Sequence, residues 1–306
     1  MEEHQEGSEL TNSDKGLKNM KTLYVTDLDG TLMRNDMTIS EESVRMLNQL
    51  IDKGVFITYA TARSFHSAYE ITKDIHFKVP VITRNGTTFA DNENAKELET
   101  AYFPVEVLSE LKEKLPIIEN TGFTSVYING EMFKVYLEGP KSKEFQGYID
   151  YYKSIGDKRL LEVDDFEKLF AEKTRTSYIT LISSREELLP YYETVKDSDR
   201  WEAIFQKDTY RDEFWLEICP KDATKAKAVL KLKDKLKCDR VVVFGDSVND
   251  LPMFEIADEA VSVSNAIKEA LDAADQIIDC NENDAVPKYI QKCENYKAKN
   301  CVRKSL

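Results

Sequence analysis

Two carboxylates stand two residues apart where a short apolar run of the chain ends. The run covers residues 23–26, and Asp27, Asp29, Gly30 and Thr31 follow it. In an extended segment this spacing points both carboxylates to the same side, and the glycine lets the backbone turn sharply. Paired carboxylates of this kind can supply a nucleophile, a general acid and base, or metal ligands. The alternatives are an ordinary acidic loop and an EF-hand loop, although the sixth position lacks the glycine of an EF-hand.

A second apolar run, residues 241–244, also ends in side chains that could serve a metal site or a reaction. Asp246, Asn249 and Asp250 follow it. Both runs are typical of buried strands, and open α/β sheets bind ligands at the carboxyl ends of such strands. The sequence therefore predicts that Asp246 approaches Asp27. Asp250 has a second interpretation, as a cap of the helix that follows it.

Two further segments between these acids carry groups that can bind phosphate. Thr61, Ala62 and Arg63 follow a third apolar run, residues 55–59, and Lys225 lies in a lysine-rich helical segment. A threonine hydroxyl and the next backbone N–H can donate to a phosphate, and a lysine can neutralise its charge. Taken alone, Lys225 would be one solvated lysine among several on its helix. Arg63 could contact substrate or form a structural ion pair.

These four segments, taken in order, resemble the four motifs of the haloacid dehalogenase (HAD) superfamily of phosphohydrolases. The form Gly-Asp-x-x-Asn-Asp at residues 245–250 and a large insertion in mid-chain are most similar to the Cof-type subfamily, which carries a C2B cap. The resemblance extends from about residue 21 to about residue 290. It implies an α/β fold, with a Rossmann-like, three-layer core around a parallel sheet and an inserted α+β cap domain of the C2B type.

The resemblance also implies a role for each acid. Asp27 would be the nucleophile that forms an aspartyl-phosphate, and Asp29 the general acid and base. Lys225 would neutralise Asp27 and the phosphate. Asp27, the backbone carbonyl of Asp29, and Asp246 would bind Mg²⁺, which prefers oxygen ligands in octahedral geometry. Asp250 would complete the metal site from behind these ligands by orienting metal-bound waters.

Substrate binding is expected from six residues that the resemblance places near the phosphate: Thr61, Ala62, Arg63, Asn85, Lys225 and Asn249. Ala62 departs from the family, which usually has glycine at this position. The change is costly only if the position needs a positive φ. Asn85 has an alternative interpretation as a turn residue.

The chain around the motifs predicts a discontinuous core domain. Short strands and helices alternate over residues 20–89, which is typical of a parallel sheet wound in βαβ units. The same pattern resumes over residues 215–296. We therefore expect these two segments to fold together into one HAD-like catalytic core.

The segment between them has a different pattern. Residues 90–214 mix helices with strand-like runs, two of which flank the hairpin signal Asn129-Gly130, and they are expected to form the cap domain. Residues 1–19 are expected to be a disordered tail, so that translation could start at Met1 or at Met20. A basic tail at residues 297–306 is expected to be frayed.

Composition limits the partners of the chain. Its 306 residues, 42% of them hydrophobic, suffice for about two domains with a substantial core. The net charge of −14 argues against a general affinity for nucleic acid or anionic membranes, and no apolar stretch reaches the ~20 residues of a membrane span. Five cysteines in no disulfide or zinc pattern indicate a reduced, cytoplasmic protein. We expect a monomer or weak homodimer that acts on a small phosphorylated metabolite.

The expected reaction is hydrolysis of small phosphorylated metabolites, with sugar phosphates as the first class and pyridoxal or flavin-type phosphates as the second. Two alternatives stay open: a phosphomannomutase-like phosphotransferase on the same scaffold, and a catalytically silent phosphometabolite-binding protein. The presence of Asp27, Asp29, Lys225 and Asp246 argues against the silent protein. Most aromatic residues of the cap are expected in its core, while those at loop tips could stack on a sugar or a cofactor ring.

Overall fold

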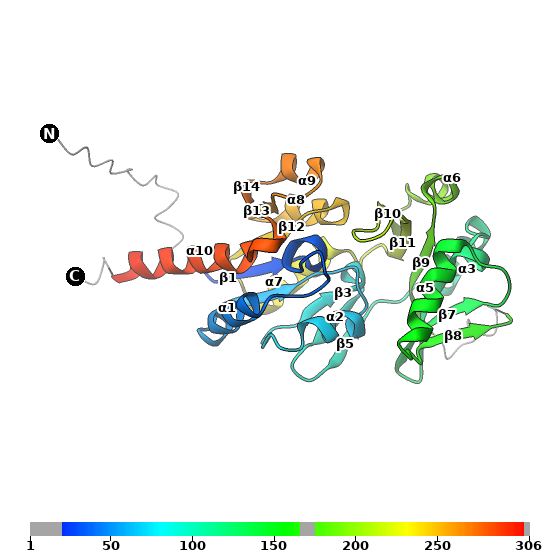
Figure 1. Ribbon diagram of the computed structural model, residues 1–306, viewed down its shortest axis with the longest axis horizontal. Coiled ribbons are helices and arrows are strands. Elements are labelled where there is room, and N and C mark those ends of the chain that lie inside the picture. Colours follow the sequence, from blue (N-terminus) through cyan, green and yellow to red (C-terminus); the bar gives the residue numbers. More distant parts are fainter. Residues whose placement is uncertain (1–19, 166–174, 303–306) are drawn as a thin grey trace.

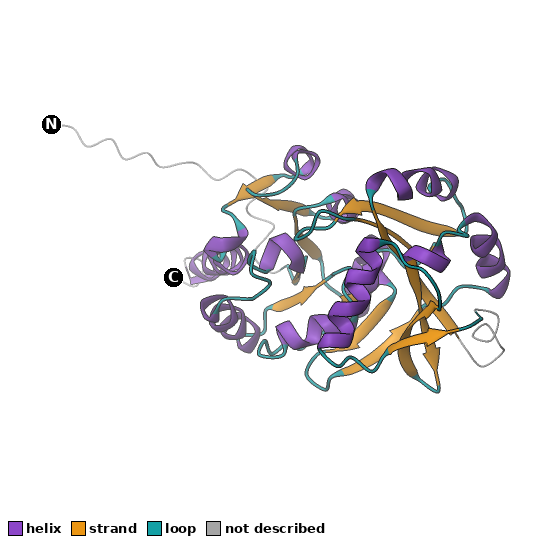
Figure 2. Ribbon diagram, turned by 45° about the vertical axis from the view of Figure 1, so that its right-hand side comes forward, coloured by secondary structure: helices purple, strands orange, loops and turns teal. Residues whose placement is uncertain are grey.

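The computed structural model describes residues 20–165 and 175–302, which fold into two units lying side by side (Figures 1 and 2). One unit contains both ends of the described chain, and the other is built from its middle. The tail expected at residues 1–19 and most of a helix expected at residues 165–172 lie outside the described residues.

A five-stranded, entirely parallel sheet forms the centre of the first unit, called the core here, in the order β14-β13-β12-β1-β2. Its strands are β1 (Thr22–Thr26), β2 (Phe56–Tyr59), β12 (Arg240–Gly245), β13 (Glu259–Val263) and β14 (Gln276–Ile278). β1 is buried along its whole length, as expected for a strand covered on both faces. The chain adds strands on one side of β1 first and on the other side later, so the strand order reverses between β1 and β12. Open α/β sheets bind ligands at such a reversal.

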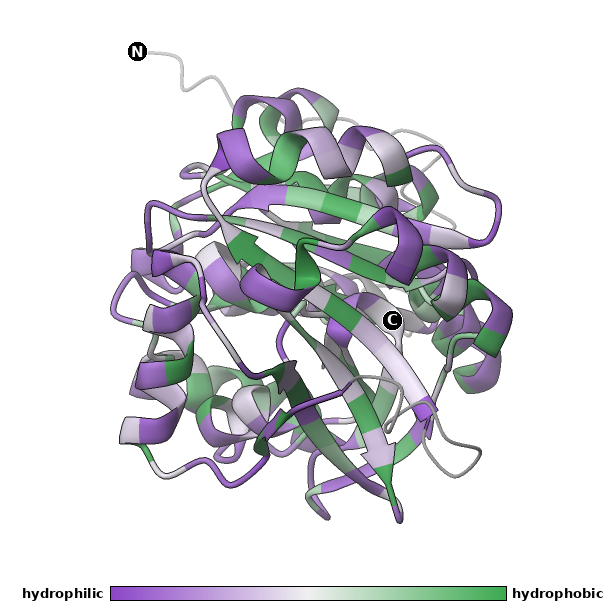
Figure 3. Cartoon of the chain, turned by 90° about the vertical axis from the view of Figure 1, so that its right-hand side faces the viewer, coloured by the Kyte–Doolittle hydropathy of each residue, from purple (hydrophilic) through white to green (hydrophobic). Residues whose placement is uncertain are grey.

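Helices cover both faces of this sheet and complete three layers. Tyr24 of β1 packs toward one face and Leu23 and Val25 toward the other. The helices on the Tyr24 face are α1 (Glu41–Asp52), α2 (Phe65–Thr72) and α10 (Ala285–Val302). Those on the opposite face are α7 (Lys225–Leu236), α8 (Leu251–Ile256) and α9 (Lys268–Ala273). The helices carry both hydrophobic and hydrophilic residues (Figure 3), and their buried residues lie on the sheet side, so the expected α/β, Rossmann-like core is confirmed.

A small antiparallel sheet extends one edge of the core. Its strands are β3 (Val81–Thr83), β4 (Thr88–Asp91) and β5 (Lys96–Thr100). β3 follows β2 in space through a single parallel bridge between Ala60 and Ile82. The sequence predicted β3 but not β4 or β5. β5 has no buried residue, so it lacks the alternation of apolar side chains that indicates a strand.

The second unit, called the cap here, is built on a six-stranded sheet in the order β10-β11-β9-β6-β7-β8. Neighbouring strands are antiparallel except β7 and β8. The strands are β6 (Gly122–Ile128), β7 (Glu131–Leu137), β8 (Leu160–Val163), β9 (Arg175–Ser183), β10 (Trp201–Lys207) and β11 (Phe214–Pro220). As predicted, Asn129 and Gly130 join β6 to β7, and both have positive φ.

The two faces of the cap sheet differ in character. On one face, side chains such as Ile179 and Leu216 pack against α3 (Val105–Lys114), α4 (Ile118–Thr121) and α6 (Arg185–Val195). The opposite face is polar and aromatic, and α5 (Lys143–Ser154) covers part of it. The residues on this second face that meet a cavity shared with the core are Phe123, Ser125, Lys134, Tyr178, Thr180, Trp215 and Glu217.

The sheets place the limits of the cap differently from the sequence. β4 and β5 pair with β3, so the chain enters the cap only after Thr100, and β11 keeps it in the cap sheet to Pro220. The expected first residue of the cap, 90, and the expected last residue, 214, therefore each lie N-terminal to the corresponding limit in the structure. The shift arises because sheet membership depends on pairing with distant strands, which leaves no local signal.

The expectation of a frayed tail from residue 297 is wrong for the residues that the structure describes. α10 continues to Val302, and Lys297 Nζ lies 2.7 Å from Glu294 Oε1 and donates to Thr22 Oγ1 at 2.9 Å. The contact with Thr22 fastens the helix to β1. In the described ranges no helix, including α10 as the longest, combines the length and the apolar character that crossing a membrane requires.

Candidate active site

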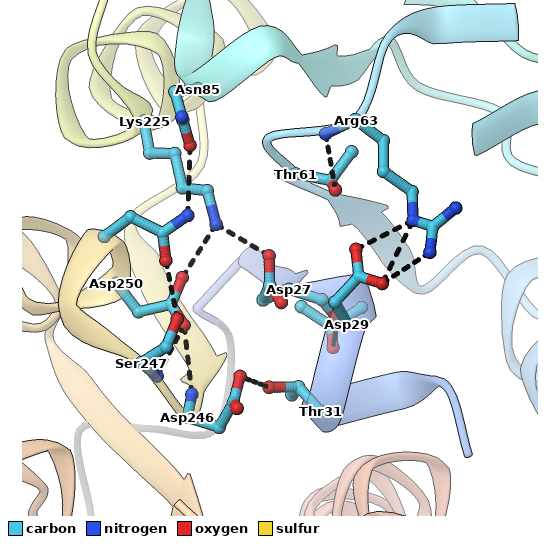
Figure 4. Close-up of polar contacts among 12 residues, drawn as sticks. Asp27, Asp29, Thr31, Thr61, Arg63, Asn85, Lys225, Asp246, Ser247 and Asp250 are labelled. Atoms are coloured by element: carbon cyan, nitrogen blue, oxygen red, sulfur yellow. Dashed lines mark hydrogen bonds and ion pairs between the residues drawn. The ribbon is translucent and has the colours of Figure 1, made fainter. Parts of the chain in front are cut away.

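Asp27 lies at the carboxyl end of β1, in contact with Lys225 in the first turn of α7 (Figure 4). Lys225 Nζ donates to Asp27 Oδ1 at 2.6 Å and to Asp250 Oδ1 at 2.8 Å. All three side chains are buried. Burial disfavours the ammonium, but Asp250 and Asp27 outweigh it and raise the pKa of Lys225. Burial also raises the pKa of Asp27, and Lys225 opposes that shift.

Asp250 fastens the loop after β12 in addition to binding Lys225. Its Oδ2 accepts the backbone N–H groups of Asp246 at 3.0 Å and Ser247 at 3.2 Å. Ser247 and Asp250 form a capping box at the helical turn that follows. Asp250 therefore takes part in the cap of this turn, although its side chain makes no cap hydrogen bond to α8, which follows it. Its expected role behind the metal ligands stays a prediction. Because both of its oxygens already accept hydrogen bonds, Asp250 is suited to orienting the site.

Asp246, just after β12, reaches the turn that follows Asp27. Its Oδ1 accepts a hydrogen bond from Thr31 Oγ1 at 2.9 Å. Gly30 has a φ of +74°, and a Cβ there would lie 2.4 Å from Asp246 Oδ2, so only glycine permits this approach. Burial, followed by the neighbouring Asp250 carboxylate, raises the pKa of Asp246 to about 7.

The predicted meeting of Asp27 with Asp246 is found, and the donor set suits a metal. One carboxylate oxygen from each of Asp27, Asp246 and Asp250 lies within 4.8 Å of the others. In the described chain no lysine or arginine forms an ion pair with Asp246, since Lys225 is directed to the other two acids. Buried carboxylates this close need further positive charge. An all-oxygen set fits a hard divalent cation such as Mg²⁺.

Thr61, Ala62 and Arg63 form the turn after β2 and face Asp29. Thr61 is fully buried, and its Oγ1 accepts the backbone N–H of Arg63 at 3.1 Å. Ala62 is not among the described non-glycine residues with positive φ, so it replaces the glycine of the family without backbone strain. Arg63 donates from Nε and Nη2 to both oxygens of Asp29, at 2.7 to 3.0 Å. The ion pair of its two interpretations is thus present, and contact with substrate stays a prediction, since Arg63 also lines the cavity described below.

Asn85 links three segments through its side-chain amide. Its Nδ2 donates to the Tyr178 hydroxyl at 2.6 Å and to Glu217 Oε2 at 3.2 Å, both on the cap sheet. Its Oδ1 accepts from Asn249 Nδ2 at 3.1 Å. Asn249 Oδ1 in turn accepts from the Ser247 hydroxyl at 2.7 Å. The amide of Asn85 is thus used to join the core loop to the cap, a contact that neither of its expected roles included.

A cavity of about 250 Å³ extends from Asp27 and Asp29 to the polar face of the cap sheet. This volume is near the lower end of the range for small-molecule sites, roughly 300 Å³ upward, and suits a small metabolite. Of the six residues expected to bind substrate, those in the cavity wall are Ala62, Arg63 and Asn249. The other three, Thr61, Asn85 and Lys225, are buried behind this wall.

Several cap residues in the wall were not assigned to the site from the sequence. Tyr210, in the loop between β10 and β11, has a buried hydroxyl, and burial together with Asp29 raises its pKa. Burial raises the pKa of Glu217 to about 7. Lys134 on β7 and Tyr178 on β9 lie on the same face of the cap sheet, on either side of β6. The one available signal is the alternation of polar and apolar residues along β9 and β11, which usually indicates a solvent-facing side.

Comparison with known proteins gives a consistent result. The family model described as haloacid dehalogenase-like hydrolase matches residues 24–290. The 5-amino-6-(5-phospho-D-ribitylamino)uracil phosphatase YitU of Bacillus subtilis is 24% identical over 280 residues, covering 88% of this chain and 96% of the relative. The HMP-PP phosphatase of Serratia proteamaculans is 24% identical over 284 residues, covering 89% of this chain and 95% of the relative.

Solved structures show the same likeness. A protein of Thermotoga maritima superposes with a TM-score of 0.67 at 25% identity, covering 89% of this chain and 97% of the other. A haloacid dehalogenase-like hydrolase from Bacillus subtilis superposes with a TM-score of 0.72 at 18% identity, covering 89% and 99%. The second likeness concerns the fold alone, and both extend over the core and the cap together.

Proposed function

Because the chain belongs to the haloacid dehalogenase-like hydrolases, in their Cof-type form, we propose that it is a Mg²⁺-dependent phosphatase of small phosphorylated metabolites. The observation that carries the proposal is the contact of Lys225 with Asp27 at the strand-order reversal, opposite Asp246. A carboxylate that attacks a phosphate dianion must have positive charge beside it. The buried Lys225 ammonium supplies that charge at the attacking atom.

In the proposed reaction, an oxygen of Asp27 attacks phosphorus and forms an aspartyl-phosphate. Asp29, which takes up a proton when the phosphate dianion binds beside it, gives that proton to the departing alcohol oxygen. Asp29 then takes a proton from water, which attacks the acyl-phosphate and releases inorganic phosphate. Arg63 holds the Asp29 carboxylate in position through both of its oxygens. Thr61 offers its hydroxyl proton, and the next backbone N–H, to the phosphate oxygens.

The metal site completes the proposed charge balance. Asp27, the Asp29 carbonyl and Asp246 would hold Mg²⁺, with Asp250 and Asn249 behind them. When bound, the ion would offset the negative charge of the phosphate and the acids and help to align the attack. Burial and Asp250 raise the pKa of Asp246, with only partial opposition from Lys225, and a cation bound there would offset the charge of this carboxylate.

Two substrate classes are supported by different observations. The small cavity and its many polar wall residues favour sugar phosphates. The relatives named as phosphatases of a ribitylaminouracil phosphate and of HMP-PP favour leaving groups that contain a ring, and the aromatic wall formed by Tyr148, Tyr152 and Trp215 could stack on one. We propose sugar phosphates as the first substrate class and phosphates of flat aromatic rings, such as pyridoxal or flavin-type phosphates, as the second. A cytoplasmic location and a monomeric or weakly dimeric state remain predictions.

The phosphomannomutase-like alternative uses the same groups, with a sugar in place of water as the final acceptor. Product analysis separates the two, since hydrolysis releases inorganic phosphate and the mutase reaction yields an isomerised sugar phosphate. A silent binding protein would bind phosphorylated ligands without either product. The complete set of Asp27, Asp29, Lys225 and paired Arg63 favours an active enzyme.

The test is phosphate release from a panel of sugar, nucleotide and cofactor phosphates, with p-nitrophenyl phosphate as a general probe. Asp27→Asn should lower kcat by at least about 10³-fold, because the amide is a poor nucleophile, while circular dichroism stays unchanged. Asp36→Asn, an exposed acid outside the cavity, is the matched control and should retain full activity. Near-normal phosphate release by Asp27→Asn would rule out the aspartyl-phosphate route.

A further inference from the structure

Lys134 is a buried cation on the cavity side of the cap sheet. It lies on β7, paired in register with Ser125 of β6, and only 4% of its surface is exposed. Its ammonium is 3.4 Å from the centroid of the Tyr152 ring, 5.2 Å from that of Tyr148 and 5.9 Å from that of Phe123. All four side chains line the cavity that begins at Asp27. Three ring faces thus surround the ammonium where a carboxylate would normally be found.

The acids near Lys134 already have other partners. Asp157, whose charge acts on Lys134 most strongly, forms a bidentate ion pair with Arg159 at 2.6 and 2.8 Å. In the cavity wall, Glu217 accepts from Asn85, and Asp208 accepts two backbone N–H groups at 2.8 Å. Glu213 accepts from the indole of Trp215 at 3.2 Å. Within the described residues, Lys134 forms no hydrogen bond through its ammonium and no ion pair.

Arg84 is a second buried cation in the same wall. Its Nη1 donates to the Tyr127 hydroxyl at 2.8 Å and lies 3.4 Å from Glu97 Oε1. Its Nη2 is buried and has no hydrogen-bond partner among the described residues. Burial lowers the pKa of Lys134 well below its usual value, and the charges of Arg159 and Arg84 add to this effect. Lys134 and Arg84 line one cavity, and each has N–H groups that no described residue accepts.

Lys134 reaches the cavity from β7 of the cap, and Arg84 reaches it from the core turn beside Arg63, whose carbonyl accepts the Arg84 backbone N–H at 2.9 Å. Arg63 itself pairs with Asp29. On the cap side, the Tyr152 ring carries the Lys134 ammonium on its face. A ligand that fills the cavity from Asp27 outward would reach Lys134 with the part that leaves as the alcohol.

We propose that Lys134 and Arg84 form a second anion subsite, and that the preferred substrates carry a carboxylate or a second phosphate on the leaving group. The proposal rests on the proposed phosphatase function and specifies the substrate class within it. An anion at this subsite would receive charge-assisted hydrogen bonds from N–H groups that otherwise have none. It would also restore the charge that burial disfavours on Lys134. Lys134 then determines specificity without contacting the reacting phosphorus.

The experiment measures binding by calorimetry in the Asp27→Asn protein, so that turnover is not required. The probes are sorbitol 6-phosphate and 6-phosphogluconate, which are both open chains and differ in the carboxylate at the end far from the phosphate. We expect the unaltered cap to bind 6-phosphogluconate about tenfold more tightly or better. Lys134→Met, which keeps the apolar stem and removes the charge, should abolish that preference, and Lys134→Arg should keep much of it.

Lys153→Met is the matched control, because Lys153 is also a cap lysine beside a tyrosine ring, at 5.8 Å from Tyr136, but lies outside the cavity wall. It should keep the full preference. Equal binding of the two probes by the unaltered cap would overturn the proposal even if the Lys134 variants failed to fold. A preference that survives in folded Lys134→Met would overturn it as well. Absence of phosphate release from p-nitrophenyl phosphate by the protein with Asp27 intact would instead count against the phosphatase function.

Discussion

The Asp29 carboxylate is held by the Arg63 guanidinium in a two-point ion pair, with Nη2 to Oδ1 at 2.7 Å and Nε to Oδ2 at 2.8 Å. Both side chains are about one-fifth exposed and line the cavity. Asp29 is therefore fixed in direction before any substrate binds. A planar guanidinium achieves this through two parallel hydrogen bonds, which a lysine ammonium does not reproduce.

Arg63→Lys should accordingly lower kcat by about tenfold or more, with a smaller change in KM, because the charge remains but the orientation of Asp29 is lost. The measurement is steady-state phosphate release on the best substrate found. Arg45→Lys provides the control, since Arg45 forms a similar fork with Glu42 on the exposed surface of α1. If both variants were equally active, the orienting role of Arg63 would have to be abandoned.

Activity should depend on Mg²⁺, since no described cation forms an ion pair with Asp246 in the buried acidic cluster. Removal of divalent ions with EDTA should abolish phosphate release, and Mg²⁺ should restore it, with Mn²⁺ or Co²⁺ replacing it in part. Ca²⁺ should inhibit, because it takes more ligands in a looser shell and would disturb the aligned attack. Mg²⁺ should also raise the melting temperature, and Asp246→Asn should remove most of that rise. Full activity after exhaustive chelation would contradict the metal assignment.

The parts of the site that the sequence predicts correctly are those that depend on the order of nearby residues along the chain. Asp27 and Asp246 each follow a buried strand, and parallel strands bring such ends to one edge of a sheet. The αβ alternation of the core and the Asn129-Gly130 hairpin follow from short-range rules of the same kind. The selection of Lys225 from a helix rich in lysine came only from the resemblance, and the structure gives its physical reason in the contacts with Asp27 and Asp250.

The remaining features depend on which distant surfaces meet. Arg63 and Asp29 are 34 residues apart, and Asn85 and Glu217 are 132 apart. Neither pairing has a local signature, because the first forms between the ends of two core strands and the second only where the cap meets the core. The same holds for Lys134, whose position on a strand with polar neighbours predicts exposure. Packing of the cap face against α5 and the core buries it instead.

Glu217 should make stability depend on pH. Burial raises its pKa from 4.5 to about 7 in the folded protein. Between these values the folded state keeps a proton that the unfolded state has lost, so stability falls as pH rises through this window. The whole contribution is about 3 kcal/mol. The measurement is the free energy of urea unfolding at pH 5 and pH 8. The difference between Glu217→Gln and the parent should shift in favour of Glu217→Gln at pH 8.

The comparison of the two proteins isolates Glu217, because other titrating groups are shared. The glutamine can still accept a hydrogen bond from Asn85 and keeps the size of the side chain. If the difference in unfolding free energy between the parent and Glu217→Gln did not change from pH 5 to pH 8, Glu217 would titrate normally in the folded state. The hydrogen bond of Glu217 with Asn85, which joins the cap to the core, would then not depend on the protonation of Glu217.

Gly30 controls the approach of the turn after β1 to Asp246. An alanine there would have its Cβ 2.4 Å from Asp246 Oδ2 and would also have to adopt a φ of +74°. Gly54→Ala is the control, since Gly54 has a φ of +87° but nothing lies within 4 Å of the added Cβ. Each variant should lose about 1 kcal/mol of stability to backbone strain. Only Gly30→Ala should also displace Asp246, weakening Mg²⁺ binding and lowering kcat by about tenfold or more. Mg²⁺ affinity is measured by titration of activity or melting temperature. Equal affinity in the two variants would show that metal binding does not depend on the close approach of Gly30 to Asp246.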